Sequence, residues 1–158
     1  MTMPCLASPT TITAGPYKVS FDLGTENVRH VPAEEITWRD GATCIELFVI
    51  TDKTGYADIW IYHQDEPISK EVEEERLEEL AVAASGWNIV RNVTTREIDD
   101  SEGVFTVLKH PDKSPLLYRV VYRPLFDYRR MFIAIDSTFS LNEGTEQLLN
   151  TIHVERRQ

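Results

Sequence analysis

The strongest single pattern in the sequence is helical and covers residues 68–86, ISKEVEEERLEELAVAASG, whereas strand-like patterns fill most of the remaining chain. Ser69 suits the N-cap, and Gly86 stands where a helix favours a left-handed residue at its C-terminus. The acidic residues indicate that one side of this helix faces water. The predicted packed stripe is Val72, Leu77, Leu80, Ala81 and Ala84, and the predicted solvent-facing residues are Glu71, Glu74, Glu75, Glu78 and Glu79.

The run Glu73-Glu74-Glu75 within this helix has two interpretations. Solvated helix faces are usually charged, so the favoured interpretation is an ordinary wet surface. The alternative is a docking surface for a basic partner.

Strand patterns surround the helix. Apolar and polar residues alternate strictly over Tyr17–Leu23, which predicts a strand with one buried face. Residues 44–51 and 56–63 predict a hairpin around a turn that ends in Gly55. Further strands are predicted at 36–38, 87–98, 103–110, 116–123 and 130–136.

The C-terminal region predicts a second, shorter helix. Ser140 and Glu143 form a capping box, and Leu148, Leu149 and Ile152 follow as an apolar stripe. The predicted fold class is therefore α+β, an antiparallel sheet of about six or seven strands with one long and one C-terminal helix packed on it.

Length and composition predict one domain. With 158 residues, of which 42% are hydrophobic, the chain can form one ordinary core. Residues 1–10 are rich in Pro, Thr, Ser and Ala and predict a flexible arm, which leaves 11–158 as a single α+β domain.

The charge of the chain bears on its partners. A formal net charge of −10 opposes nucleic-acid binding, which relies on clustered positive charge. No apolar run is long enough to predict a membrane span, so we expect a soluble chain. Localisation and oligomeric state stay open, and a mature exported or cell-surface domain is one alternative.

Two stretches resemble a known superfamily. They are Phe132-Ile133-Ala134-Ile135-Asp136-Ser137 and a leucine-rich helix ending in Leu148-Leu149-Asn150-Thr151-Ile152-His153-Val154. Together with the element order, they resemble small bacterial and cyanobacterial members of the Mog1/PsbP-like superfamily. The resemblance implies an α/β/α sandwich and a non-enzymatic accessory role, as in photosystem-associated and transport-factor-binding proteins.

Signatures of catalysis and of metal binding are absent from the sequence. His30, His63, His110 and His153 lie far apart, and no nucleophile elbow, glycine-rich phosphate loop or dinucleotide fingerprint occurs. We therefore predict no catalytic residues, no metal and no cofactor. The alternative is a small hydrolase or transferase that uses distant carboxylates with His63 or His110.

Four arginines surround the predicted turn at residues 124–128 and form the only local concentration of positive charge. They can clamp a carboxylate or phosphate or meet an acidic protein surface, although pairing with the protein's own glutamates is the favoured interpretation. The four are Arg119, Arg123, Arg129 and Arg130.

Tyr56, Trp60 and Tyr62 share one face of a predicted strand, and Tyr118 and Tyr122 alternate in the same way on a later strand. Aromatic residues with polar tips suit a recognition surface. A sheet face packed beneath the helix is the favoured interpretation.

These observations favour a non-catalytic accessory or protein-interaction module. The first alternative is a small-ligand-binding domain whose aromatic residues form a pocket under the helix. A deep cavity lined by Tyr56, Trp60 and Tyr62 would favour that alternative, and a solid interior would favour a surface interaction.

Cys5 and Cys44 are predicted not to form a required disulfide, because one lies in the arm and the other in a strand. The melting temperature should hardly change when a thiol reductant is added. A fall of several degrees would contradict this, since closing a loop of about 40 residues contributes on the order of 3–4 kcal/mol.

Overall fold

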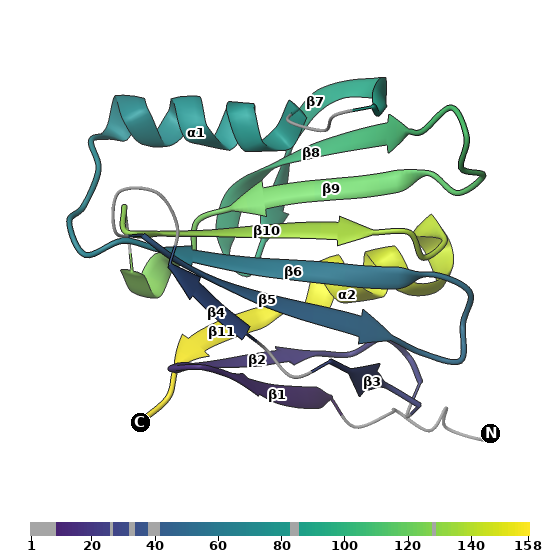
Figure 1. Cartoon of the computed structure of the whole chain (residues 1–158), viewed down its shortest axis with the longest axis horizontal. Coiled ribbons are helices and arrows are strands. Elements are labelled where there is room, and N and C mark those ends of the chain that lie inside the picture. The colour runs from purple at the N-terminus through teal and green to yellow at the C-terminus, as the bar shows by residue number, and fades with distance from the viewer. Residues whose placement is uncertain (1–8, 26, 32–33, 38–41, 83–85, 128) are drawn as a thin grey trace.

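The computed structural model describes the chain except for residues 1–8, 26, 32–33, 38–41, 83–85 and 128 (Figure 1). The described strands form an eight-stranded antiparallel sheet and a three-stranded one. The large sheet has the order β3 (Arg29–His30), β5 (Thr43–Ile50), β6 (Tyr56–His63), β10 (Met131–Ser137), β9 (Leu117–Tyr122), β8 (Ser101–Lys109) and β7 (Asn88–Ile98), and β4 (Glu34–Thr37) also pairs with β5. The small sheet has the order β1 (Thr10–Ala14), β2 (Tyr17–Phe21) and β11 (His153–Arg156).

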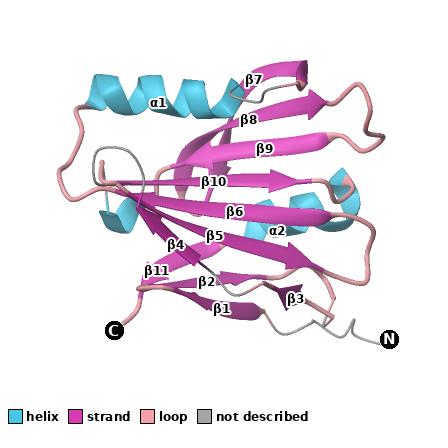
Figure 2. Cartoon of the chain, viewed as in Figure 1, coloured by secondary structure: helices cyan, strands magenta, loops and turns pink. Residues whose placement is uncertain are grey.

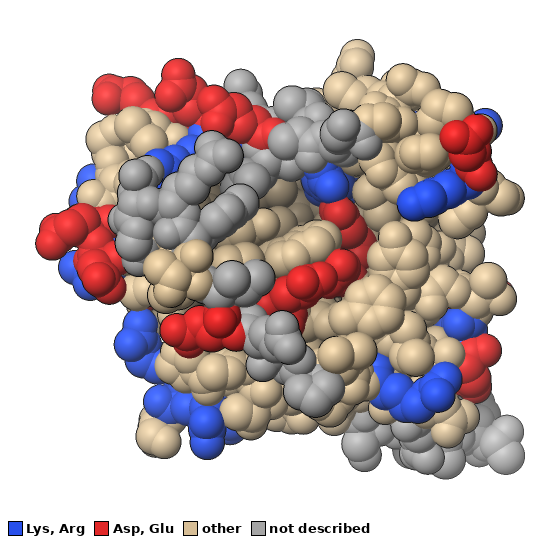
Figure 3. Space-filling model, viewed as in Figure 1, with Lys and Arg blue, Asp and Glu red and all other residues tan. Residues whose placement is uncertain are grey.

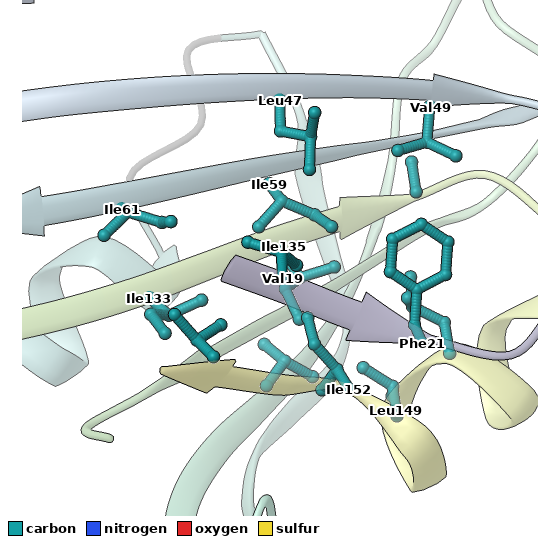
Figure 4. Close-up of a cluster of buried hydrophobic side chains, with 14 of the residues drawn as sticks. Val19, Phe21, Leu47, Val49, Ile59, Ile61, Ile133, Ile135, Leu149 and Ile152 are labelled. Atoms are coloured by element: carbon teal, nitrogen blue, oxygen red, sulfur yellow. The ribbon is translucent and has the colours of Figure 1, made fainter. Parts of the chain in front are cut away.

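The small sheet and helix α2 (Glu146–Thr151) cover one face of the large sheet, which we call the core face. Figure 4 shows Val19 and Phe21 of β2 together with Leu149 of α2 among aliphatic side chains of β5, β6 and β10. Alternation along β6 explains this packing, because Ala57, Ile59 and Ile61 all point to the core face. Each such fully buried aliphatic side chain contributes roughly 1.5–3 kcal/mol.

The opposite face, which we call the open face, is covered only in part by helix α1 (Lys70–Val82). Leu77 of α1 packs on Val121, Phe132 and Ala134 in a second, smaller cluster. Figure 2 shows α1 along the β7–β8 side of the sheet, with no helix in front of β5 and β6.

The prediction of a mostly antiparallel α+β fold is confirmed, but the prediction of one long helix is wrong. Helix α1 has 13 residues and α2 has 6. A three-stranded sheet accompanies α2 on the core face, so the cover on that side is not purely helical. His153 and Val154 were expected to end a helix, but His153–Arg156 is strand β11, because Ile152 adopts an extended conformation after α2.

The predicted strands agree closely with the observed ones. Strand β6 has the predicted bounds, and the meander β7–β8–β9–β10 pairs in sequence order. The predicted strand at 36–38 corresponds to β4, although Trp38 lies outside the described residues. Strands β1 and β3 were not predicted, and residues 1–8 of the predicted arm also lie outside the described residues.

Both predicted N-caps form. Ser69 Oγ accepts a hydrogen bond from Val72 N at 3.3 Å, and Ser140 Oγ accepts one from Glu143 N at 3.2 Å. The second cap starts a short π-helical turn, η3 (Leu141–Thr145), which leads into α2. None of the described helices is long and apolar enough to cross a lipid bilayer.

The packed side of α1 differs from the predicted stripe. Leu77 is buried as predicted, but Val72 is 37% exposed, while Glu73 is 0% exposed and forms an ion pair with Arg123, which directly follows β9. The guanidinium below the helix explains why a carboxylate faces the sheet. Glu71, Glu74, Glu75 and Glu79 are exposed, whereas the side chains of Leu80, Ala81, Ala84 and Glu78 lie outside the described part.

Glu73→Ala should therefore destabilise the protein by roughly 3–5 kcal/mol, because it removes the carboxylate that forms an ion pair with the largely buried guanidinium of Arg123 beneath the helix. The matched change Glu75→Ala removes an exposed carboxylate and should cost about 0.5 kcal/mol or less. Urea unfolding measures both values. Equal losses would contradict the observed helix orientation, and the double variant Glu73→Leu/Arg123→Met should recover most of the stability.

Candidate functional site

The structure divides the four predicted arginines between two surfaces. Arg119 of β9 and Arg123, the residue directly after β9, lie on the open face of the sheet, where both form ion pairs within the protein. Arg119 contacts Asp136 of β10 through Nε–Oδ1 at 2.7 Å and Nη2–Oδ2 at 2.8 Å, a bidentate arrangement. Arg129 and Arg130 are exposed in the turn before β10.

The turn that carries Arg129 and Arg130 follows a short 3₁₀-helix, η2 (Leu125–Asp127). The backbone N–H of Arg130 donates to Asp127 O at 3.2 Å, which closes the turn. Leu125 is 60% exposed and Phe126 is 42% exposed, so two large apolar side chains stand beside the two cations.

Strand β11 brings Arg156 to this turn. Arg156 Nη2 lies 3.2 Å from Asp127 Oδ2, and its guanidinium lies 5.8 Å from the centroid of the Tyr17 ring. Arg157 follows directly, and its backbone N–H donates to Pro16 O at 2.8 Å. We call the resulting surface the arginine edge, and it comprises Leu125, Phe126, Arg129, Arg130, Arg156 and Arg157.

Asp127 connects the elements of the arginine edge. In addition to Arg156, its Oδ2 lies 2.9 Å from Nε2 of His63 at the end of β6. The ring of Tyr17 in β2 lies near both His63 and Phe126, with centroid distances of 6.4 Å and 6.3 Å. Figure 3 shows basic residues along this left-hand edge of the molecule.

Sequence reasoning missed Arg156 and Arg157 because it read the residues up to Val154 as a helix and so did not predict strand β11. A strand signal was present, since Val154 is buried and its neighbours His153 and Glu155 are exposed.

The predicted aromatic residues lie elsewhere, on the open face of β6. Tyr56, Trp60 and Tyr62 are all half-buried, and Trp60 and Tyr62 border the cluster around Leu77. Tyr118 and Tyr122 face the core instead, where Tyr122 is fully buried. The two sets of aromatic residues therefore do not form one surface.

Acidic side chains accompany these aromatic residues. Strand register places Glu46 of β5 opposite Trp60, and Asp58 of β6 opposite Asp136 of β10. Figure 3 shows acidic residues in a hollow in the middle of this face, below α1. We call this surface the acidic face, and it comprises Glu46, Phe48, Tyr56, Asp58, Trp60, Tyr62 and Asp136.

Asp58 has the most unusual environment on the acidic face. Burial, a hydrogen bond with the Glu46 carboxyl and the negative charges of Glu46 and Asp136 raise the pKa of Asp58 to about 8. Asp58 therefore retains its proton near neutral pH. Burial and the charge of Glu46 likewise raise the pKa of Cys44 to about 11, so this thiol stays protonated.

The two histidines of the alternative enzymatic site are not brought together. His63 pairs with Met131 at the start of β10. His110 comes directly after β8, at the opposite end of the sheet, and its ring meets that of Trp87 edge to face. Within the described ranges, no group of three or more His, Cys, Asp or Glu residues has an arrangement that could hold a metal ion.

Comparisons with protein-family models, with curated proteins and with solved structures find no match for this chain. The surfaces described above are therefore interpreted from their own chemistry.

Asp58 should make the stability of the protein depend on pH. The pKa of Asp58 is about 8 in the folded protein, compared with an ordinary value of 3.8 for an aspartate in the unfolded chain. Between about pH 4 and pH 8, the folded state therefore binds one more proton at this carboxyl than the unfolded state. Stability should fall as pH rises from about 4 to 8, because folding then opposes ionisation of a half-buried carboxyl.

Thermal melts of the wild type, Asp58→Asn and the control Glu75→Gln across this pH range measure the effect. Asp58→Asn should flatten the decline, while Glu75→Gln should follow the wild type. Parallel curves for the wild type and Asp58→Asn would contradict the assigned environment of Asp58.

Proposed function

We propose that this protein is a non-catalytic interaction module that binds an acidic partner protein through the arginine edge. The observation that carries the proposal is the convergence of β11 on the turn after η2. It brings Arg156 to the turn that carries the exposed Arg129 and Arg130, and the exposed Arg157 follows Arg156 in the chain.

The composition of the arginine edge suits a protein partner. Arginine forms bidentate contacts with carboxylates and is enriched at protein interfaces. Leu125 and Phe126 supply an exposed apolar centre within the cationic surface. Such a surface fits a partner segment that combines carboxylates with apolar side chains.

The surroundings of the edge favour directed binding. The chain carries a formal net charge of −10, so a local cationic surface on an acidic body steers an acidic partner to one place. Exposed Asp65 and Glu66 limit the edge on one side, because the segment that holds them is hydrogen-bonded to the backbone carbonyls of Arg129 and Arg130.

The resemblance to the Mog1/PsbP-like superfamily agrees with this proposal, because members of that superfamily are generally accessory or binding proteins. A resemblance in element order supports no particular partner. The antiparallel α+β architecture is compatible with it.

A charge-reversal pair tests the proposal. Arg130→Glu/Arg157→Glu places two negative charges on the edge, and Lys109→Glu/Lys113→Glu makes the same change in net charge at exposed lysines elsewhere. The probe is a fluorescent peptide of alternating acidic and leucine residues. Fluorescence anisotropy should show binding by the wild type that weakens with salt and falls about tenfold or more in the edge variant.

The lysine variant controls for overall charge and should bind within about twofold of the wild type. Equal losses in the two variants would mean that net charge alone attracts the peptide. Unchanged binding in the edge variant would reject the arginine edge as the contact surface.

A further inference from the structure

The acidic face is a second, chemically opposite surface that the proposed function does not use. One row of side chains crosses it in register, from Thr106 of β8 through Arg119, Asp136 and Asp58 to Phe48 of β5. A neighbouring row contains Ala134, Trp60 and Glu46. Carboxylates and aromatic rings therefore lie side by side on the middle strands.

The carboxylates of this face are not equally neutralised. Arg119 and Asp136 form a bidentate pair. In the part of the chain that the structure describes, no salt bridge reaches Glu46 or Asp58. Asp58 Oδ1 is buried and also lacks a hydrogen-bond partner there. A buried acceptor without a donor is costly, so a ligand that supplies a donor is favoured at this position.

The aromatic residues complement a cation that is attached to an apolar chain. Trp60 lies beside Glu46 and Asp58, and Phe48 stacks on Tyr56 with ring centroids 5.2 Å apart. An ammonium or guanidinium group gains from both carboxylates and ring faces, and its aliphatic stem can lie against the rings.

We propose that the acidic face is a docking surface for a basic, amphipathic segment of a partner protein. A lysine or arginine of this segment pairs with Asp58 and Glu46, and its apolar side chains contact Trp60 and Phe48. Charge complementarity selects this occupant, since no described cation forms a salt bridge with Glu46 or Asp58 and the protein as a whole is acidic.

Binding at this surface is linked to a proton. The free protein holds Asp58 protonated near neutral pH, and a cation that seats beside it favours the carboxylate. Binding therefore releases a proton and strengthens as pH rises towards 8.

The other groups that face Asp58 do not replace it in this role. Asp136 is paired with Arg119. Burial raises the pKa values of Tyr56, Tyr62 and Cys44, so all three stay neutral over this pH range. Glu46 lies beside Asp58 and belongs to the same site.

Titration calorimetry with a synthetic helical peptide of lysine and leucine tests the inference. The titration is repeated at neutral pH in two buffers with different ionisation enthalpies, which reports proton release directly. Glu46→Gln/Asp58→Asn should weaken binding about tenfold or more and abolish the release. The matched variant Asp112→Asn/Glu143→Gln removes two exposed charges elsewhere and should bind within about twofold of the wild type.

Three results would overturn the inference. Equal weakening in both variants would show attraction by net charge alone. Equal binding of a peptide with glutamate in place of lysine would show an apolar contact only. A simple alkylamine that binds as tightly as the peptide would show a small-cation site instead of a segment-binding surface. Thermal melts of each variant verify folding. Asp58→Asn should remain folded, because it removes a half-buried carboxyl whose ionisation is unfavourable.

Discussion

The packing of the small sheet and α2 against β5, β6 and β10 is the interaction on which the rest of the structure depends. It buries aliphatic side chains on one face of the large sheet and so determines the register of every central strand. Because the period of a strand is two, the alternate residues must face the other side. The residues of the open face are therefore not needed for the main core, and carboxylates and aromatic rings occupy many of these positions.

A second constraint places α1 on that open face. The ion pair between Glu73 and Arg123, together with Leu77, holds the helix over one side of the sheet. The carboxylates of Glu46 and Asp58 on the central strands are left without an ion-pairing partner among the described residues. The position of α1 on one side of the sheet therefore leaves the acidic face on the central strands without cover from this helix.

Much of the fold follows from local sequence patterns, but the surfaces do not. Alternation and turn residues predicted the main strands, because those signals are local. Glu73 was assigned to water because helical spacing cannot report that Arg123 lies beneath it. Arg156 was not singled out, because its contact with Asp127 joins residues far apart in sequence. Surfaces built from such distant residues need the tertiary structure.

The small sheet has a consequence for how the protein forms. Its central strand β2 pairs on one side with β1 and on the other with β11, so segments from the two ends of the sequence lie next to each other. During synthesis, residues 10–21 must wait for β11 before their second edge is paired, and the apolar side chains of β2 stay uncovered until α2 has also emerged. Such distant pairing makes folding slow and leaves a nascent chain that is open to aggregation, so the cell would need to protect this segment while translation continues.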